Sequence, residues 1–446
     1  MSGSDQDIRL WGDVGSTSGF SRRGMLRALA GGVAASALGL ASLPRLALAQ
    51  DVDPIQAMLR SQLNTASDGF DAGSSGAASV RTTAPVLSSQ TTAAVQAAVA
   101  QYTNIVAQGG WPQVPPAQPG KDGKQQVSLG MRDPSVVTLR QRLAVTGDLA
   151  PGIPSSDIFD SYVDAAVRRF QARHGLPSDG VVAGTTLVVM NVPAATRLAQ
   201  LQTNLVRLTA MSGSLGDRFV MVNIPAASIE VVDQGRVVQR HTAVVGKIDR
   251  ETPIINSKIY RITFYPNWTV PASIIRKDLI PVMQKKPDYL DKKHIRIYDP
   301  QGQEIPSTAI DWTTDQATKG YLFRQDPGDF NSLGTVRISF HNDEDVYMHD
   351  TPEKDIFGNV ERFDSSGCVR VQNVRQLVVW LLRDNPDFQR DRVEQIFKSG
   401  EQVDVQLKPE VPVYLEYITA WASPDGGIYF RDDIYNRDGV GQLASQ

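Results

Sequence analysis

The feature that most constrains the fold is a change in the spacing of apolar residues near residue 218. Before this point, around residues 136–143 and 163–170, apolar residues recur every three or four positions, which predicts amphipathic helices. After it, the short runs 219–224 and 228–232 are strongly apolar and have the period of β-strands. Helices followed by strands in separate stretches of one chain predict an α+β protein with more than one domain.

Residues 1–49 have the features of an export signal. Arg22-Arg23 precedes a stretch from Ala28 to Leu43 that carries no charge, and Ala47-Leu48-Ala49 supplies the small residues that a signal peptidase recognises. Together these features resemble a twin-arginine (Tat) signal, with a Sec signal or an uncut N-terminal anchor as the alternatives. We expect a mature protein that begins at Gln50 and lies in the periplasm. We expect no membrane span in it, because no later stretch is long and apolar enough.

Residues 50–127 are rich in Ala, Ser, Thr, Gln, Gly and Pro, which is the composition of a linker. Within them, residues 92–108 carry apolar side chains at helical spacing and stop at Gly109-Gly110. We therefore expect a linker and helical scaffold region that holds one packed helix. Residues 193–217 are expected to form a helix that leads into the strand-rich part of the chain.

Residues 128–192 are predicted to form three helices. Gly175 suits a helix C-terminus, Asp179-Gly180 suits a tight turn, and Thr185 or Thr186 is expected to cap the third helix. The pattern FQxxxGLxxDGxxxxxT in this segment resembles the small three-helix peptidoglycan-binding domain. A generic helical bundle is the alternative interpretation.

Residues 218–410 are predicted to form a mainly-β domain. Further strands are expected at 237–245, 258–265, 336–340 and 345–349. A helix is expected at 374–382, with Asn373 as its N-cap. Residues 271–334 are too long and irregular for an ordinary loop, so we expect a capping insertion over a groove, with a plain surface excursion as the alternative. Residues 411–446 are expected to be a C-terminal extension that packs on this domain.

The scarcity of cysteine and histidine restricts the chemistry that is open to the chain. One cysteine in 446 residues rules out an intramolecular disulfide and any zinc site built from several cysteines. Five scattered histidines do not indicate a metal centre, and a formal net charge of -3 gives no general reason to bind nucleic acid. The phosphate-binding pattern GxxxxGK[ST] is missing as well. We therefore expect no metal, no cofactor and no nucleic-acid partner.

The lone cysteine lies in a setting that favours a nucleophile over a small buried hydrophobe. Cys368 follows Gly367, which allows a ligand to approach the backbone closely, and Arg370 lies on the same side of an extended chain. His349 ends a predicted strand 19 residues upstream, a gap that can return the chain beside it. A thiol needs deprotonation to attack, and an imidazole can take that proton. A carboxylate or a backbone carbonyl near Asp350 would orient the imidazole.

Several segments resemble the catalytic domain of YkuD-type L,D-transpeptidases. The most specific are His349-Asp350-Thr351-Pro352 and Ser365-Ser366-Gly367-Cys368-Val369-Arg370-Val371. The familiar signature has His before the Gly-Cys pair, whereas Ser366 in that position is similar to the large periplasmic branch typified by YcbB. The same branch is indicated by Val245-Gly246-Lys247 with Thr252-Pro253, Asn267-Trp268-Thr269-Val270-Pro271 and Tyr417-Ile418-Thr419-Ala420-Trp421.

The resemblance implies a β-sandwich domain with a packed helix and a capping insertion, and a reaction on peptidoglycan. Cys368 would attack a tetrapeptide stem at the L-centre of meso-diaminopimelate, release D-Ala and form a thioester. The amine of a second diaminopimelate would then give a 3→3 cross-link. His349 would activate the thiol, and backbone groups at Gly367, Ser366 and Asp350 would serve the oxyanion and the catalytic loop.

The resemblance also implies three substrate-binding residues, each with an alternative. Arg370 would bind the stem peptide or hold the catalytic loop in shape. Tyr347 would line the donor site or pack in the core. Trp268 would form a wall of the groove or pack in the core.

Three functions are open at this point. The first is the cross-linking transpeptidase. The second keeps the thioester but uses water or a protein amine as acceptor, which makes the enzyme a carboxypeptidase or attaches an outer-membrane protein to peptidoglycan. The third is a non-catalytic wall-binding scaffold that uses only residues 128–192, and the presence of both Cys368 and His349 argues against it.

Overall fold

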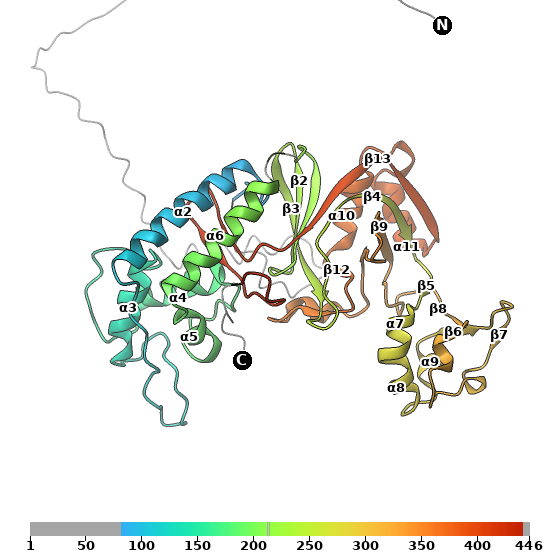
Figure 1. The fold of residues 1–446 in the computed structure, drawn as a ribbon, viewed down its shortest axis with the longest axis horizontal. Coiled ribbons are helices and arrows are strands. Elements are labelled where there is room, and N and C mark those ends of the chain that lie inside the picture. The colour runs from blue at the N-terminus through green and yellow to red at the C-terminus, as the bar shows by residue number, and fades with distance from the viewer. Residues whose placement is uncertain (1–81, 212, 214, 440–446) are drawn as a thin grey trace, which may run out of the picture. The chain divides into compact units, whose positions relative to one another are not determined.

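The computed structural model describes residues 82–211, 213 and 215–439 (Figure 1). The expected export signal at 1–49 lies outside these residues. Within the described part of the chain, no helix has the length and apolarity that crossing a membrane requires.

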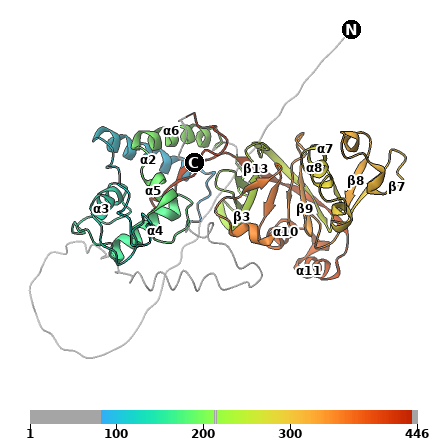
Figure 2. The ribbon, with the colours of Figure 1, turned by 90° about the horizontal axis from the view of Figure 1, so that it is seen from below.

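Two long helices, α2 (Ser89–Ala107) and α6 (Ala194–Met211), lie side by side (Figures 1 and 2). They correspond to the helices expected at 92–108 and 193–217. Helix α2 begins where the Ser88 hydroxyl accepts a hydrogen bond of 3.1 Å from the Thr91 N–H, which satisfies a donor of the first turn. The apolar faces of both helices share one core with a C-terminal hairpin of β14 (Ala420–Ala422) and β15 (Ile428–Phe430).

Three shorter helices form a module with its own core. They are α3 (Ser135–Val145), α4 (Ser161–Arg173) and α5 (Gly184–Met190). Asp160 caps α4 by accepting hydrogen bonds from the N–H groups of Tyr162 and Val163, and Gly175 ends it with a φ of 72°. The prediction that Thr185 or Thr186 caps α5 is wrong. Ala183 holds the cap position, and the Thr186 hydroxyl instead accepts a hydrogen bond of 3.3 Å from Gln171 Nε2.

A single nine-stranded sheet forms the β-rich domain, in the order β11-β3-β12-β10-β9-β4-β13-β1-β2. Its strands are β1 (Phe219–Asn223), β2 (Ser228–Asp233), β3 (Arg236–Gly246), β4 (Ile255–Phe264), β9 (Val336–Phe340), β10 (Met348–His349), β11 (Phe363–Ser365), β12 (Val369–Val371) and β13 (Val403–Glu416). Strand β2 also pairs with β3, so the sheet closes on itself and encloses its apolar side chains. The expected α+β class with a mainly-β domain is confirmed, and the two faces expected of a sandwich belong to one continuous sheet.

Two helices cover this domain, α10 (Val374–Leu382) and α11 (Arg390–Ser399). The apolar residues of α10 lie in the same core as the strands, as expected for the packed helix. Asn373 does occupy the N-cap position, but its φ of 53° is left-handed and its side chain makes no capping hydrogen bond. The helix is therefore held by burial of its apolar face and not by its cap.

The segment 271–334 folds around a core of its own, which sets it apart from a plain loop. It contains the helical turns α7 (Ala272–Ile274), η1 (Ile275–Leu279), α8 (Ile280–Met283) and α9 (Tyr289–Lys292). It also contributes β6 (Ile295–Tyr298), β7 (Glu304–Ile305) and β8 (Leu322–Gln325) to a small sheet that β5 (Trp268–Thr269) completes. Figure 2 shows these elements grouped beside β9.

The C-terminal extension begins later than expected. The boundary expected at 410–411 falls inside β13, which pairs with β4 and β1 and so belongs to the main sheet. Beyond β13 the chain packs on the β-rich domain, as expected, through Tyr417 and Tyr435, and it also contacts the helical part. Gln200 Nε2 on α6 donates to the Arg431 carbonyl at 2.8 Å, and Arg431 Nη1 donates to the carbonyl of Arg173 at 3.0 Å.

Candidate active site

The strand register brings the expected catalytic residues onto one face of the sheet. Strand β10 lies between β9 and β12, and His349 is opposite Arg337 on one side and Arg370 on the other. The adjacent rung, Ile338, Met348 and Val369, is fully buried in the core. Because neighbouring residues of a strand point to opposite faces, the His349 rung points away from the core. Tyr347 and Cys368 each precede a residue of the apolar rung, so they lie on the same outer face as His349.

The orientation of His349 is fixed by a hydrogen bond of one ring nitrogen. It is buried, and its Nδ1 lies 2.5 Å from the carbonyl oxygen of Asp350. A carbonyl oxygen only accepts hydrogen bonds, so Nδ1 carries the proton and Nε2 keeps a lone pair. Burial lowers the pKa of the imidazole to about 3, and the charges of Arg370 and Arg337 act in the same direction. At neutral pH the ring is therefore uncharged and able to accept a proton.

Cys368 is partly exposed. Burial raises the pKa of the thiol to about 11, against the weaker lowering by hydrogen bonds with Tyr347 and by the charges of Arg337 and Arg370. The Sγ atom lies 3.9 Å from the carbonyl oxygen of Asp345, to which the thiol can donate. The free protein thus holds a protonated thiol at neutral pH.

The loop before Cys368 is fixed by its own hydrogen bonds. Gly367 has a φ of +111°, which L side chains rarely adopt, so glycine is required there. Its N–H donates to the Ser365 hydroxyl at 3.2 Å, and its carbonyl accepts from the Thr252 hydroxyl at 2.8 Å. Ser366, next in the chain before Gly367, accepts a hydrogen bond of 2.9 Å from Arg250. The loop is therefore held from the segment that follows β3.

A second glycine explains how this segment comes so close. A Cβ on Gly246 would lie 2.1 Å from the carbonyl oxygen of Arg250, so only glycine permits this approach. The Gly246 N–H donates to the Thr252 hydroxyl at 2.8 Å. Tyr435, from the C-terminal extension, donates to the Gly246 carbonyl at 2.6 Å and accepts from the Thr252 N–H at 3.2 Å. Residues far apart in sequence thus support the cysteine loop.

Asp350 orients the imidazole through its carbonyl, one of the two possibilities expected. Its carboxylate is engaged elsewhere, because Oδ2 accepts hydrogen bonds from the N–H and hydroxyl of Thr335 at 3.0 and 2.8 Å. The other oxygen pairs with Lys354. The carboxylate therefore anchors the strand end on which His349 lies.

Two of the expected substrate-binding residues, Tyr347 and Trp268, lie next to each other near His349. The Tyr347 ring lies 5.7 Å from the His349 ring, and the pKa of its hydroxyl is raised by burial and by the neighbouring thiol of Cys368. A hydrogen bond with Trp268 opposes that rise, which places Trp268 beside Tyr347. Trp268 also packs against the core of the capping insertion. Arg370 forms an ion pair of 3.2 Å with Glu353 across the surface.

Arg250 joins the capping insertion to the cysteine loop, and nothing in the sequence pattern pointed to it. Its Nη1 donates to Asp278 Oδ2 at 2.6 Å and to Ser366 Oγ at 2.9 Å, while Nη2 donates to Asp278 Oδ1 at 2.9 Å. Asp278 lies on η1 of the insertion. A two-pronged arginine–carboxylate pair fixes orientation as well as distance. The insertion is thereby tied to Ser366, two positions before Cys368.

We expect Asp278→Asn to loosen this tie and to expose Cys368. Because Asp278 is partly exposed, the loss should be modest, and we expect roughly two- to fivefold faster alkylation of the thiol by iodoacetamide. The matched control is Asp288→Asn, which makes the same change at the exposed Asp288–Lys292 pair of the insertion. Equal alkylation rates in the two variants would show that the Arg250 contact does not restrict access.

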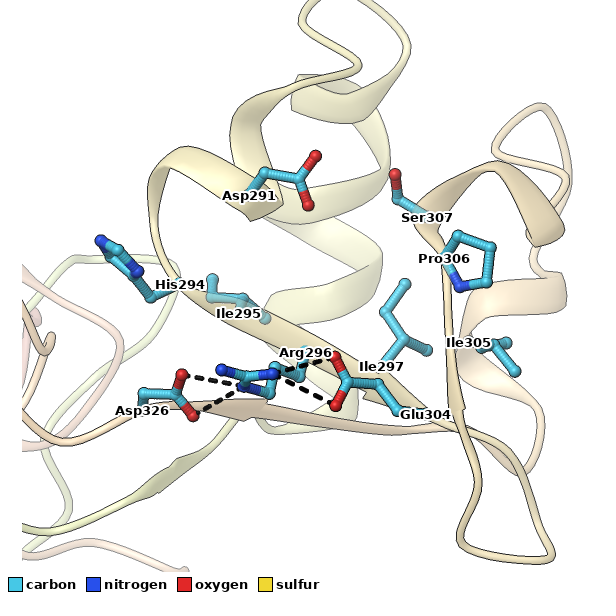
Figure 3. Close-up of a pocket in the computed structure, with 10 residues that line it drawn as sticks. All are labelled: Asp291, His294, Ile295, Arg296, Ile297, Glu304, Ile305, Pro306, Ser307 and Asp326. Atoms are coloured by element: carbon cyan, nitrogen blue, oxygen red, sulfur yellow. Dashed lines mark hydrogen bonds and ion pairs between the residues drawn. The ribbon is translucent and has the colours of Figure 1, made fainter.

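One hollow of about 500 Å³ lies within the capping insertion (Figure 3). Figure 3 shows Arg296 between Asp326 and Glu304, and its Nε and Nη1 pair with these carboxylates at 2.8 and 3.1 Å. The residues that line it include neither Cys368 nor His349. The guanidinium of Arg296 is already neutralised by Asp326 and Glu304, so the residues that line this hollow offer no group for the expected chemistry.

A second hollow, of about 510 Å³, lies between the three-helix module and the β-rich domain. One wall contains residues of the module motif, including Gly175, Leu176 and Asp179. The opposite wall contains Val360, Glu361, Arg362 and Phe363, the segment that continues through β11 to Cys368. Among the described residues, no group of three or more His, Cys, Asp or Glu side chains is placed to hold a metal ion.

Two family models match the chain at the positions of these domains. Residues 217–405 match YkuD, described as the L,D-transpeptidase catalytic domain. The chain carries a YkuD-type catalytic domain. Residues 132–190 match a second model, described as "Putative peptidoglycan binding domain", which covers the three-helix module. The resemblance seen in the two sequence motifs is confirmed by these matches.

The chain is also similar to individual known proteins. A curated protein of Haemophilus influenzae named "Putative L,D-transpeptidase" is 32% identical over 225 residues, which are 50% of this chain and 45% of that protein. The match thus spans less than half of the relative's length. Among solved structures, the L,D-transpeptidase from Mycobacterium smegmatis is 13% identical with a TM-score of 0.22, covering 45% of this chain and 58% of that one. The L,D-transpeptidase from Stackebrandtia nassauensis is 13% identical with a TM-score of 0.21, covering 62% and 88%.

Proposed function

We propose that this protein is an exported L,D-transpeptidase that forms 3→3 cross-links between diaminopimelate residues of peptidoglycan stems. The observation that carries the proposal is the placement of His349, with Nε2 available, in the strand beside Cys368 on one face of the sheet. A thiol beside an uncharged, oriented base is the arrangement that acyl transfer through a thioester requires. The YkuD match supports this reaction class, and the peptidoglycan-binding domain supports the polymer as the partner.

The first half-reaction transfers the stem to the enzyme. His349 Nε2 takes the thiol proton as Sγ attacks the carbonyl carbon at the L-centre of meso-diaminopimelate. The S–C bond forms, the C–N bond to D-Ala breaks, and the imidazolium gives its proton to the departing amine. The N–H of Gly367 already serves Ser365, so we assign the oxyanion to the N–H of Cys368, a kind of contact that is worth about 2.7–4 kcal/mol.

The second half-reaction transfers the stem to an acceptor. The uncharged side-chain amine of a second diaminopimelate attacks the thioester carbonyl, and a C–N bond replaces the C–S bond. The amine proton passes to His349 and returns to the thiolate of Cys368, which restores the resting thiol. Water or a protein amine in place of that acceptor would give a carboxypeptidase or attach an outer-membrane protein to the wall.

The hollow between the three-helix module and the β-rich domain supports the proposal that both domains contact the wall polymer. Its module wall is the motif segment of the peptidoglycan-binding domain, and its other wall leads along the chain to the nucleophile. A strand of peptidoglycan held there would raise the local concentration of stems near Cys368. An enzyme that acts on this polymer works outside the cytoplasm, in keeping with the expected Tat signal and the periplasm.

The proposal is tested by incubating the full chain with disaccharide tetrapeptide and separating the products by liquid chromatography and mass spectrometry. We expect a dimer with the mass of two substrates less one D-Ala, and fragmentation that places the new bond between two diaminopimelate residues. Tripeptide as the sole product would establish water as the acceptor and overturn the cross-linking proposal. Unchanged substrate after prolonged incubation would overturn the thioester chemistry itself.

A further inference from the structure

Arg337 is a cation on the catalytic face with no anion to balance it. It lies on β9, directly opposite His349, and its guanidinium carbon is 4.2 Å from the centre of the Tyr347 ring. Its Nε is buried without a hydrogen-bond partner, and none of the described carboxylates forms an ion pair with it. The other arginine of this rung, Arg370, already pairs with Glu353. A buried guanidinium nitrogen without a hydrogen-bond partner is costly, and a ligand that accepts its hydrogen bond would remove this cost.

The position of Arg337 relative to the nucleophile limits which part of a substrate it can reach. Strands β9 and β12 flank β10, so the main chains that carry Arg337 and Cys368 are about 10 Å apart, two strand spacings. Both side chains point to the same face, and the Tyr347 ring between them contacts both. The guanidinium therefore lies on the same face as the Cys368 thiol, with the Tyr347 ring between them.

A tetrapeptide stem offers a carboxylate close to the scissile bond. Only the amide nitrogen and the α-carbon of D-Ala separate the scissile carbonyl from the terminal carboxylate of the stem. A guanidinium matches a carboxylate with two parallel hydrogen bonds, and its charge does not depend on pH in the working range. Building on the proposed function, we propose that Arg337 binds the terminal carboxylate of the leaving D-Ala and so selects stems that end one residue beyond the scissile bond.

The proposal predicts a preference that can be measured with two matched substrates. One is disaccharide tetrapeptide with its free terminal carboxylate, and the other carries a terminal carboxamide. The full-length wild-type enzyme should release the C-terminal residue from the carboxylate substrate with roughly ten- to a hundredfold higher kcat/KM, the range expected for a hydrogen bond to a charged group. Arg337→Gln should lose this advantage and process both substrates at the rate of the carboxamide, whereas Arg337→Lys should keep part of it.

Two controls separate substrate binding from a structural role. Arg296→Gln removes a guanidinium of the capping insertion that is paired with Asp326 and Glu304, and it should leave the preference unchanged. Melting curves of all variants check that they fold. If Arg337 only supports the fold, Arg337→Gln will slow both substrates equally, and the ratio between them will stay as in the wild type.

The outcomes also distinguish this proposal from the one on which it rests. Release of D-Ala by Arg337→Gln with the wild-type preference intact would overturn the role of Arg337 and leave the transpeptidase proposal standing. A wild-type enzyme that releases the terminal residue from neither substrate would overturn both. Loss of the preference in Arg337→Gln, with carboxamide turnover unchanged, is the result we expect.

Discussion

Replacing Cys368 by alanine is expected to abolish cross-linking and thioester formation completely. The chain contains one cysteine, so no other thiol can take its place. The substitution removes Sγ, whose hydrogen-bonding contacts are limited to weak ones such as that to the Asp345 carbonyl, and it leaves the loop hydrogen bonds of Gly367 in place. We therefore expect loss of activity to the background rate with a melting temperature close to that of the wild type.

A carbapenem provides an independent readout of the same residue. By analogy with the family, its ring-opened acyl group should remain on sulfur and increase the mass of the peptide that contains Cys368. The increase should be missing from Cys368→Ala under the same conditions. Cross-linking by the alanine variant, or acylation of any other peptide in it, would contradict the assignment of the nucleophile.

Replacing His349 by asparagine is expected to lower kcat/KM by roughly a hundred- to ten-thousandfold at pH 7, the contribution typical of a general base. Asparagine can keep the hydrogen bond to the Asp350 carbonyl, because its side-chain N–H₂ lies near the position of Nδ1, but it has nothing in the place of Nε2. His349→Ala is the matched variant that loses both. Similar losses in the two variants would show that the base, and not the hydrogen bond, accounts for the effect.

The pH profile of His349→Asn gives the sharper test. In the wild type, His349 has a pKa of about 3 and Cys368 one of about 11, so neither group changes charge between pH 5 and 9 and acylation should be nearly flat there. Without the base, only molecules already ionised at sulfur react, so the rate should rise about tenfold for each pH unit below the thiol pKa. A flat profile in the variant, measured as carbapenem acylation, would contradict the role of His349.

The shifted pKa values of His349 and Cys368 also make the free energy of unfolding depend on pH. An imidazole whose pKa is lowered on folding is protonated first in the unfolded chain, so unfolding becomes more favourable as pH falls below the ordinary histidine value of about 6.5. A thiol whose pKa is raised loses its proton first in the unfolded chain, so stability falls above about pH 9. Titration of His349 and Cys368 therefore destabilises the folded state least between about pH 6.5 and about pH 9.

Local periodicity predicted most of the regular structure because one side of each element is buried. The strand at 336–340 and the helix at 374–382 coincide with β9 and α10, whose apolar residues lie in one core. The closure of the sheet could not be predicted, because it depends on pairing between β2 and β3 and on distant partners such as β13. Helix α11 was not anticipated at all.

The candidate site was predictable only where its residues carry a local signature. Cys368 and His349 lie in motifs, and the parallel pairing of their strands explains the spacing between them. Arg337 lies between two core positions of a predicted strand, so its direction could have been read from the alternation. Arg250 and Tyr435 had no such signal, because their contacts with the cysteine loop are made by segments that are distant in sequence.

The raised pKa of the Cys368 thiol also affects how the protein withstands oxidation. With a pKa of about 11, on the order of one molecule in ten thousand carries a thiolate at pH 7, and it is the thiolate that attacks peroxides. A sulfenic acid on Cys368 would find no second cysteine in the chain to form a disulfide and would proceed toward irreversible forms. The raised pKa therefore slows the oxidation of a thiol that has no second cysteine in its chain to rescue it.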